Sequence, residues 1–547
     1  MTFARVTDRY SAEEIEQFYA TGAWRRETFF QLLEEQAELR PDKVFLTDDT
    51  SSVTFCELRD GALRLAAGLR RAGISPGDRV CVQIPNWVEF GQIALALSRI
   101  GAIMVPIMPI YRLDEVGYIV RNSGAKMAIT CQTFKKFDYA AMYHTIQQDV
   151  PTLQRIVLAR GEAEGTTPLK SLEGGDAVDL DAGVGPDAPF VIVYSSGTTS
   201  RPKGCLHTFN TLACGSRLLA KGFGYSDGDV QFGPSPITHT TGLVTSILLP
   251  LMHGAASHVM EVWEPKAGLE HIKRFGCTLA VTATTFLQML MDVYDPAQHD
   301  ANSLRLWVAA GAPIPAAFVE QAAKLLPGCR VLSLYGRTEN VTTTMCTVED
   351  DPARSLTSDG RVLPGSSVKI VDPLGEEVPR GQEGDIAYRG PMHMLEYIDN
   401  PAETEALFTP EGYSRSGDLG VMDADGFVRV TGRLKDIVIR GGMNISVRQV
   451  EDLLTGHPAV TAAAVVGMPD RRLGERICLY LVPKPGHEGV TLDEIKEHLL
   501  ARGLAIQKMP ERLEVVPELP MTATGKIQKH RLRADIAAKI KDAEARV

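Results

Sequence analysis

Apolar residues along the chain follow two alternating patterns, short runs rich in β-branched side chains and longer stretches with helical spacing. The short runs predict buried strands, and the longer stretches predict helices with one face toward a core. Because the two patterns alternate, we expect an α/β fold in which helices cover layers of mostly parallel sheet. The predicted helices span 28–33, 58–69 and 87–100, and the predicted strands span 103–105, 191–194 and 304–309. The stretch 77–86 is predicted to form a turn, a strand and an exit loop, and a strand leading into a helix spans 279–286.

The last hundred residues or so carry a set of element signals of their own. An amphipathic helix is predicted at 447–454, followed by strands at 460–466 and 477–482. A chain of 547 residues is too long for one hydrophobic core, so two or more domains are expected. This tail is long enough to form a small domain by itself.

Composition narrows the class of protein. A hydrophobic content of 44% with 23% charged residues is ordinary for a soluble globular protein, and a net charge of −11 argues against nucleic acid as the main partner. Residues 1–16 are polar and acidic, and the most apolar region, 93–110, contains Arg99, Pro106 and Pro109, so neither a signal segment nor a membrane span is expected. Nine cysteines without paired spacing favour reduced thiols in the cytoplasm.

The first candidate for chemistry is the stretch 191–204, where a β-branched run ends in a hydroxyl-rich loop bounded by glycine. Backbone N–H groups, hydroxyl donors and the charges of Arg201 and Lys203 are what a polyphosphate requires. The stretch is not the common P-loop, because Lys203 precedes Gly204 and is followed by Cys205.

The string Tyr-Ser-Ser-Gly-Thr-Thr-Ser-Arg-Pro-Lys-Gly at 194–204 resembles the phosphate loop of the adenylate-forming superfamily, which comprises acyl- and aryl-CoA ligases, peptide-synthetase adenylation domains and beetle luciferases. Segments resembling the other motifs of that family follow in order at 335–339, 412–418, 432–446 and 519–527. The residues that the resemblance places around ATP or AMP are Ser195, Ser196, Gly197, Thr198, Thr199, Lys203, Gly311, Ala312, Pro313, Tyr335, Gly336, Thr338, Asp418, Arg433 and Lys526.

The side chains of these segments suit the parts of a nucleotide. Tyr335 offers a face for adenine, and Thr338 can donate to the α-phosphate. Glu339 is a hard oxygen ligand suited to Mg²⁺, to which the resemblance adds Thr198. A lone glutamate would otherwise be a solvated surface charge. Asp418 can accept both ribose hydroxyls.

The resemblance also implies a domain organisation. A large N-terminal domain, 1–432, would combine mixed α/β layers with a distorted β-barrel subdomain. A hinge at 433–436, centred on Lys435, would lead to a small mobile α+β domain at 437–547. That domain carries Lys526, which matches the catalytic lysine of adenylation, although a lysine in a Thr/Gly turn is otherwise usually solvated.

The same small domain carries a second functional segment by resemblance, the CoA channel formed by Arg440, Gly441 and Gly442. Lys526 and these glycines cannot occupy one site at the same time, so domain alternation between two half-reactions is expected.

The acid would bind beside His239, which meets the carboxylate by resemblance, although a lone histidine is more often a packing residue. Small residues at the strand ends leave room for a ring or a branched chain, and no charged residue marks a hydroxyacid or an amino acid. The resemblance is closest to ligases for short- and medium-chain fatty acids and alicyclic acids, with cyclohexanecarboxylate as first candidate. The expected acyl pocket consists of His239, Thr240, Thr284, Ala309, Ala310 and Gly311.

The implied reaction joins an acid to CoA through an acyl-AMP, with ATP, Mg²⁺ and CoA as reactants or cofactors and a homodimer as the family habit. The catalytic residues would be Lys526, Thr338, Glu339 and His239. The alternatives are adenylation of an aryl or medium-chain acid, loading of a carrier protein, a luciferase-type reaction, and a non-catalytic acyl or AMP sensor. Retention of Lys526, Glu339 and Asp418 together argues against the sensor.

Overall fold

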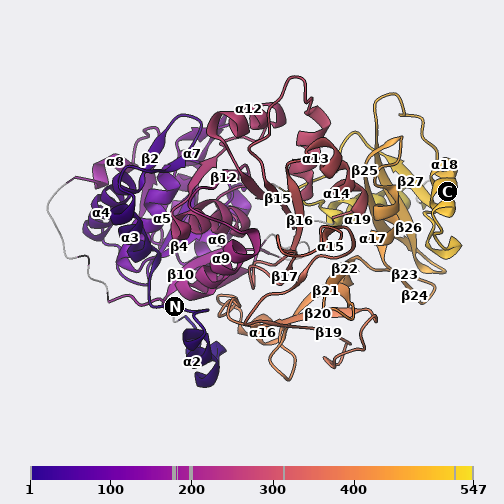
Figure 1. The fold of residues 1–547 in the computed structure, drawn as a ribbon, viewed down its shortest axis with the longest axis horizontal. Helices are drawn as coiled ribbons and strands as arrows, with labels where there is room; N and C mark the ends of the chain where they lie inside the picture. Colours follow the sequence, from indigo (N-terminus) through magenta and orange to yellow (C-terminus); the bar gives the residue numbers. More distant parts are fainter. Residues whose placement is uncertain are drawn as a thin grey trace.

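The computed structural model describes residues 3–174, 180, 183–195, 201–311, 314–522 and 525–544. Figure 1 shows N-terminal α/β layers in purple and magenta, an antiparallel sheet in orange below them, and a C-terminal unit in yellow at the far end. In the described residues, no helix is both long enough and apolar enough to cross a membrane.

Two large sheets form the N-terminal layers. In strand order, the first sheet contains β18 (Arg361–Val362), β17 (Thr344–Met345), β16 (Arg330–Tyr335), β15 (Leu306–Ala310), β14 (Leu279–Thr282), β12 (Val230–Gly233), β13 (Ala256–Val259), β1 (Val44–Thr47) and β2 (Ser52–Thr54). The second contains β11 (Gly204–Thr208), β10 (Pro189–Tyr194), β4 (Ile103–Pro106), β3 (Arg79–Gln83), β5 (Met127–Thr130), β8 (Arg155–Leu158) and β9 (Thr167–Pro168).

Most neighbouring strands in these sheets are parallel, as the alternation of patterns predicted. β11 is an exception, because it pairs antiparallel to β10. β16 ends at Tyr335, and β12, β14 and β15 end beside it in the same sheet. In open α/β sheets, ligands bind at the carboxyl ends of parallel strands, so this edge is where a site is expected.

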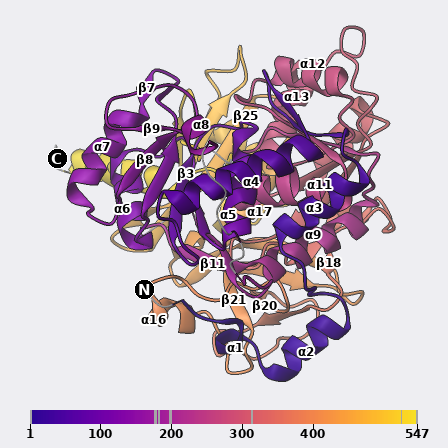
Figure 2. The same ribbon diagram turned by 90° about the vertical axis from the view of Figure 1, so that its left-hand side faces the viewer.

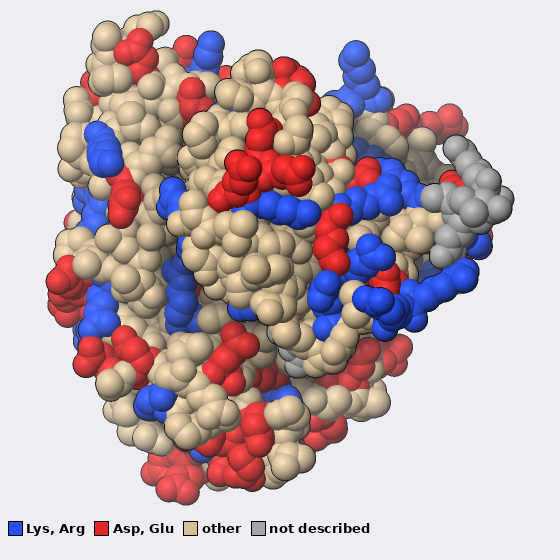
Figure 3. Space-filling view, turned by 90° about the vertical axis from the view of Figure 1, so that its right-hand side faces the viewer, with Lys and Arg blue, Asp and Glu red and all other residues tan. Residues whose placement is uncertain are grey.

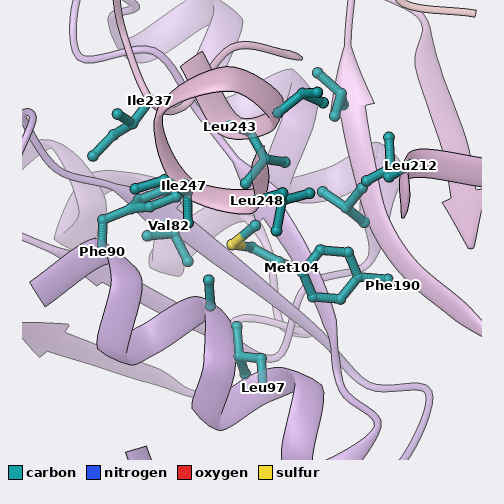
Figure 4. Packing of buried hydrophobic residues seen from close by; sticks show 14 of the residues in the cluster. Val82, Phe90, Leu97, Met104, Phe190, Leu212, Ile237, Leu243, Ile247 and Leu248 are labelled. Atoms are coloured by element: carbon teal, nitrogen blue, oxygen red, sulfur yellow. The ribbon is translucent and has the colours of Figure 1, made fainter. Parts of the chain in front are cut away.

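Helices between the two sheets join them into one core. Helices α3 (Phe29–Leu39), α4 (Phe55–Arg71), α5 (Glu89–Ile100), α9 (Phe209–Phe223) and α11 (Leu249–His253) pack against one another there (Figure 2). A π-helix at Leu243–Leu248 also enters this core. Figure 4 shows its Leu243, Ile247 and Leu248 beside Met104 of β4 and Phe190 of β10.

The predicted elements are confirmed with small shifts at their ends. The helices at 28–33, 58–69 and 87–100 correspond to α3, α4 and α5, and the strand leading into a helix at 279–286 corresponds to β14 and α13 (Thr284–Val293). The apolar region 93–110 forms the end of α5 and the strand β4, which is buried inside the protein. The apolar side chains of this region therefore pack in the hydrophobic core.

The orange sheet contains β19 (Ser367–Val371), β20 (Gly384–Arg389), β21 (Ser414–Met422) and β22 (Val428–Arg433), all antiparallel (Figure 1). Their pairing follows an open path from β19 to β22, so the described strands of this sheet do not form a closed barrel. The strand β22 ends at Arg433, where a 3₁₀ helix, Leu434–Asp436, leads toward the C-terminal unit.

The C-terminal unit is a small α+β structure with its own apolar clusters. Its sheet contains β24 (Met443–Ile445), β23 (Val438–Arg440), β26 (Gly474–Pro483), β25 (Val460–Asp470) and β27 (Arg512–Val515), and its helices are α17 (Val447–Leu454), α18 (Leu492–Ala501) and α19 (Lys529–Glu544). Figure 3 shows acidic and basic side chains interspersed over this face. Ion pairs join α19 to its surroundings, including Lys529 with Glu451 at 2.8 Å and Arg533 with Asp436.

The remaining elements cover the edges. They are α1 (Val6–Arg9), α2 (Ala12–Ala20), α6 (Leu113–Ser123), α7 (Tyr139–Asp149), α8 (Leu169–Leu172), α10 (Thr240–Gly242), α12 (Pro265–Phe275), α14 (Ala316–Leu325), α15 (Arg354–Thr357), α16 (Pro401–Glu405), the hairpin β6 (Thr133–Phe134) and β7 (Phe137–Asp138), and a 3₁₀ helix at Ile506–Lys508.

Candidate active site

Two side chains from other strands, Tyr335 of β16 and Arg433 of β22, contact Asp418, which lies in β21 and is 4% exposed. The hydroxyl of Tyr335 donates to Asp418 Oδ2 at 2.7 Å, and Arg433 Nε donates to Oδ1 at 2.6 Å. Burial, with the nearby charge of Asp418, raises the pKa of Tyr335 well above its usual value, so the phenol stays a donor at neutral pH. A carboxylate has about four acceptor positions, so Asp418 can still receive ribose hydroxyls while it holds Tyr335 in place.

The loop after β16 is held by a histidine for which the sequence analysis assigned no role. His207 in β11 contacts the carbonyl oxygen of Thr338 through Nε2 at 2.7 Å and the hydroxyl of Thr211 through Nδ1 at 3.1 Å. Burial lowers the pKa of His207 to about 4, so the ring is neutral at pH 7. Since a carbonyl only accepts, Nε2–H must donate to Thr338 and Nδ1 must accept from Thr211.

Glu339 is half-buried beside Tyr397, whose hydroxyl donates to Oε1 at 2.5 Å. Among the described contacts, this bond occupies only one carboxylate oxygen of Glu339. Mg²⁺ in nucleotide sites usually takes one or two carboxylates together with phosphate oxygens. Glu339, one residue from the hydroxyl of Thr338, fits that role, whereas the predicted partner ligand Thr198 lies outside the described residues.

The described end of the phosphate loop is positively charged and enclosed. Lys203 forms an ion pair with Glu403 of α16, and its ammonium lies 5.0 Å from the centre of the Tyr397 ring. Burial lowers the pKa of Lys203, and the charge of Lys435 acts in the same direction. The amide of Ser195 donates to the carbonyl of Lys203 at 2.9 Å and closes the loop. Ser196, Gly197, Thr198 and Thr199, like Ala312 and Pro313, lie outside the described residues.

Lys526 reaches this edge from the C-terminal unit. A Cβ placed on Gly311 would lie 3.3 Å from Lys526 Cε, so the lysine chain lies directly over that glycine. The turn that carries it fits closely, because a Cβ on Gly525 would lie 2.2 Å from the hydroxyl oxygen of Thr285 at the start of α13. Burial and the charge of Arg433 lower the pKa of Lys526 to about 8.

The residues predicted for the CoA channel lie away from the edge of the sheet that Lys526 reaches. Arg440 forms an ion pair with Glu511 at 3.0 Å, and Gly441 and Gly442 are exposed. Both glycines have a positive φ, of 58° and 83°, which side-chain-bearing residues rarely adopt. The structure therefore places Lys526 at the nucleotide edge and the two glycines at the surface.

A cavity of about 80 Å³ opens between Lys526 and the carboxyl ends of β14, β15 and β16. Four of the six residues predicted for the acyl pocket line it, namely His239, Thr240, Ala310 and Gly311. Burial and the charge of Lys526 lower the pKa of His239 to about 3, so its ring is neutral. Its Nδ1 accepts from the amide of Thr241 at 3.3 Å.

Thr284 and Ala309 are not among the lining residues of this cavity. Ala309 is adjacent to Ala310 in β15, and successive side chains of a strand point to opposite faces. Ala310 therefore belongs to the central core beside the cavity, whereas Ala309 packs in the second apolar cluster behind the sheet. Thr284 is buried at the first turn of α13, one residue beyond Ala283, which does line the cavity.

The cavity wall also contains residues that the sequence analysis did not select. Val244 and Thr245 come from the π-helix, and Leu219 comes from α9. Val341 and Thr342 come from the loop after β16, and Val341 has a φ of 55°, a left-handed conformation that is strained for a β-branched residue. Such strain costs about 1–3 kcal/mol and persists where the surrounding structure enforces it. No motif marks these positions, since the fold alone brings them together.

Comparison with known proteins agrees with this arrangement. Residues 33–398 match the family model of the AMP-binding enzymes, and 449–526 match the model of the AMP-binding enzyme C-terminal domain. The chain is 33% identical over 540 residues to the medium-chain fatty-acid–CoA ligase of Escherichia coli (strain K12), covering 98% of this chain and 95% of that protein. It is 31% identical over 531 residues to the 2,3-dihydroxybenzoate-AMP ligase of Bacillus subtilis (strain 168), covering 96% and 97%.

Among solved structures, the anthranilate CoA ligase AuaEII in complex with anthranoyl-AMP matches with a TM-score of 0.85 and 26% identity, covering 94% of this chain and 98% of that one. The family models include Glu339 and Lys526, and the match to the Escherichia coli ligase extends over 98% of the chain. The chain therefore belongs to the AMP-binding enzymes of the adenylate-forming superfamily, and it is an adenylate-forming acid ligase.

Proposed function

We propose that the enzyme converts a small carboxylic acid into its CoA thioester through an acyl-AMP, with cyclohexanecarboxylate or a short- to medium-chain acid as substrate. One observation carries the proposal: Lys526 lines the same cavity as His239 and Thr338, at the edge where Asp418 and Tyr335 meet. An acid in the cavity would thus lie next to the α-phosphate of a nucleotide held at that edge.

In the first half-reaction, a carboxylate oxygen attacks the α-phosphorus of ATP, and the bond to the β-phosphate oxygen breaks to release pyrophosphate. The neutral ring of His239 leaves the acid ionised, which is the nucleophilic form at pH 7. Lys526 and the hydroxyl of Thr338 supply donors where charge develops on the phosphate oxygens. Mg²⁺, held by Glu339, would neutralise phosphate charge when bound.

In the second half-reaction, the thiol of CoA attacks the acyl carbonyl, its proton passes to solvent, and AMP leaves with the bonding electrons. We propose that the C-terminal unit, 437–547, turns about Lys435 within a hinge at 433–436 for this step. The exposed position of Gly441 and Gly442 supports this, because the rotation of the unit would move Lys526 out of the site and bring these glycines to it. The nine cysteines are free, which fits a reducing cytoplasmic location.

The test is a pyrophosphate-release screen with ATP, Mg²⁺ and benzoate, cyclohexanecarboxylate or C4–C12 acids. We expect release with an alicyclic or a short- to medium-chain acid and thioester formation once CoA is added. A parallel arm replaces CoA with a phosphopantetheinyl carrier protein, since a 2,3-dihydroxybenzoate-AMP ligase is among the relatives. Faster transfer to the carrier would favour carrier loading, and absence of AMP with every acid would contradict the proposal.

Lys526→Ala separates the two half-reactions. Removal of a preorganised donor to the phosphate should lower the rate of acyl-AMP formation by about 10²–10³-fold. Conversion of supplied acyl-AMP to acyl-CoA should keep its rate, because the lysine has left the site in that step. Equal loss of both half-reactions would refute the role assigned to Lys526.

A further inference from the structure

A cluster of two histidines and one aspartate lies outside the acyl cavity. His258 Nε2 of β13 lies 2.8 Å from His271 Nδ1 of α12, and Asp49 Oδ1 lies 3.9 Å from the same Nδ1. One nitrogen or oxygen atom from each of the three side chains lies within 4.8 Å of the other two. In the part of the chain that the structure describes, no other trio of histidine, cysteine or acidic side chains comes together in this way. None of the three lines the acyl cavity, so the cluster is separate from the site described above.

Rigid elements hold two of the three side chains. β1 and β13 are parallel neighbours, and Thr47 is paired with His258 across them. Asp49 follows β1 in the turn toward β2. Asp48 closes that turn, since its Oδ1 accepts from the amide of Ser51 at 2.7 Å. The backbone that carries Asp49 is therefore fixed relative to His258.

The ring of His258 is held on its face and at its other nitrogen. Phe275, one turn after His271 in α12, stacks on it with ring centres 3.9 Å apart. The hydroxyl oxygen of Thr47 lies 2.9 Å from Nδ1 of His258. That hydroxyl can donate to the carbonyl of Ser257 at 3.4 Å, so it can accept from Nδ1–H and leave a lone pair on Nε2. A histidine that binds a metal usually donates its other ring N–H to a neighbouring acceptor in this way.

The two outer side chains reach solvent and can adjust. The side chain of His271 is 16% exposed and that of Asp49 is 35% exposed. In a tetrahedral zinc site, with Zn–N bonds of about 2.0–2.1 Å, neighbouring ligand atoms lie about 3.3 Å apart. The distances of 2.8 Å and 3.9 Å lie on either side of this value. Small rotations of the outer side chains would therefore bring all three ligand atoms to a common ion.

We propose that Asp49, His258 and His271 form a binding site for Zn²⁺ or a similar divalent transition-metal ion, with solvent completing its coordination. Imidazole nitrogens suit Zn²⁺, Cu²⁺ and Ni²⁺, whereas Mg²⁺ takes oxygen ligands, so Mg²⁺ does not compete for the site. Each histidine binds the ion as a neutral ring. The proton shared between the two rings moves through solvent to the other nitrogen of the ring that carried it. The bound ion would tie α12 and the turn after β1 to β13.

The experiment titrates the purified enzyme with Zn²⁺ and measures binding by calorimetry and the Tm by scanning fluorimetry. Mg²⁺ is kept in excess, so that sites made only of oxygen ligands are occupied. We expect one ion to bind per chain and to raise the Tm, because the ion binds the folded state. His271→Gln and Asp49→Asn should each lower the affinity for Zn²⁺ about tenfold or more and remove most of the rise in Tm. Both positions are partly exposed, so neither variant should prevent folding.

His498→Gln is the matched control. His498 and His457 also form a ring pair, with centres 4.4 Å apart, but their nitrogens contact the backbone. His498 Nε2 lies 3.1 Å from the carbonyl oxygen of Leu453, and His457 Nδ1 accepts from the amide of Ala459 at 3.1 Å. This variant should bind Zn²⁺ as the unaltered enzyme does. Equal affinity in His271→Gln and Asp49→Asn would place the ion elsewhere, and an enzyme that binds no Zn²⁺ would leave only a hydrogen bond between two histidines. Either result overturns the inference.

Discussion

Lys526 is a residue whose charge depends on where its domain lies. In the arrangement described, burial and the neighbouring Arg433 disfavour the protonated amine, while Asp418 and Glu339 favour it. Burial has the largest effect, and the pKa of Lys526 is lowered to about 8. An exposed lysine would titrate near its ordinary value of about 10.4, so seating Lys526 at the site brings its titration close to neutral pH.

The pH dependence of adenylation follows from this pKa. Lys526 is protonated below about pH 8 and loses its charge above it, so kcat/KM for ATP should fall about tenfold per pH unit above that value. The kcat profile should break at higher pH, because bound phosphates favour the protonated amine. Lys526→Arg keeps a charge at all these values and should remove the break. A break at pH 8 that persists in Lys526→Arg would contradict the assignment.

At the scale of elements, β11 connects two motifs. It begins at Gly204, directly after the phosphate loop, and its His207 donates to Thr338 in the loop after β16. A neutral, buried imidazole is a rigid spacer between the two strands. We infer that His207 positions Thr338 and does not touch the substrate.

His207→Leu tests this connection. Loss of the donor leaves the Thr338 carbonyl unpaired, which should lower the free energy of unfolding by about 1–3 kcal/mol. The adenylation rate should fall further than the thioester step, because only the first step uses Thr338. His207→Gln can donate to the same carbonyl and should recover part of both losses.

A matched control for this pair is His144→Leu. His144 makes the same kind of contact, from Nε2 to the carbonyl of Glu164 at 3.0 Å, but it lies at the surface. Urea unfolding measures the change in the free energy of unfolding, and single-turnover assays measure the change in the adenylation rate. If His207→Leu behaved like His144→Leu, the positioning role would be wrong.

At the scale of the whole molecule, charged residues are buried between the C-terminal unit and the layers beside it. Arg448 of α17 is 6% exposed and lies 3.5 Å from Asp452, while Arg429 of β22 lies 4.0 Å from Asp359. Burial raises the pKa of Asp452, and the charges of Arg448 and Arg429 oppose that rise. The two pairs therefore interact across the interface that holds Lys526 in the site.

Arg448→Met should weaken this interface. Removing Arg448 takes away the larger of the two charges that compensate the carboxylate of Asp452, so we expect adenylation to fall roughly tenfold or more while the thioester half-reaction is spared. Single-turnover measurements of both half-reactions give the ratio. Arg502→Met, at an exposed position after α18, serves as the control. Parallel loss of both half-reactions would indicate general destabilisation instead.

Most of the nucleotide-binding residues could be predicted from the sequence, because each lies in a short motif and its side-chain type alone indicates what it can bind. Asp418 and Arg433 were selected from segments 15 residues apart, and they form an ion pair. Lys526 was selected from a Thr/Gly turn, and it lies in the cavity. His207 and Tyr397 were missed, since a histidine and a tyrosine in unremarkable strings gain a role only from what packs beside them.

The sequence by itself determined the family, the order of elements and the residue types that could bind a nucleotide, because these depend on local periodicity and on short motifs. Tertiary structure decided which face of β15 meets the cavity, that Lys526 and not Gly441 occupies the site, and that Val341 and Thr342 belong to the cavity wall. These three features depend on contacts between residues that are far apart in the chain. If a domain turned, or if a strand shifted by one residue, different side chains would face the cavity. Local sequence cannot specify them, because it carries no information about distance across the fold.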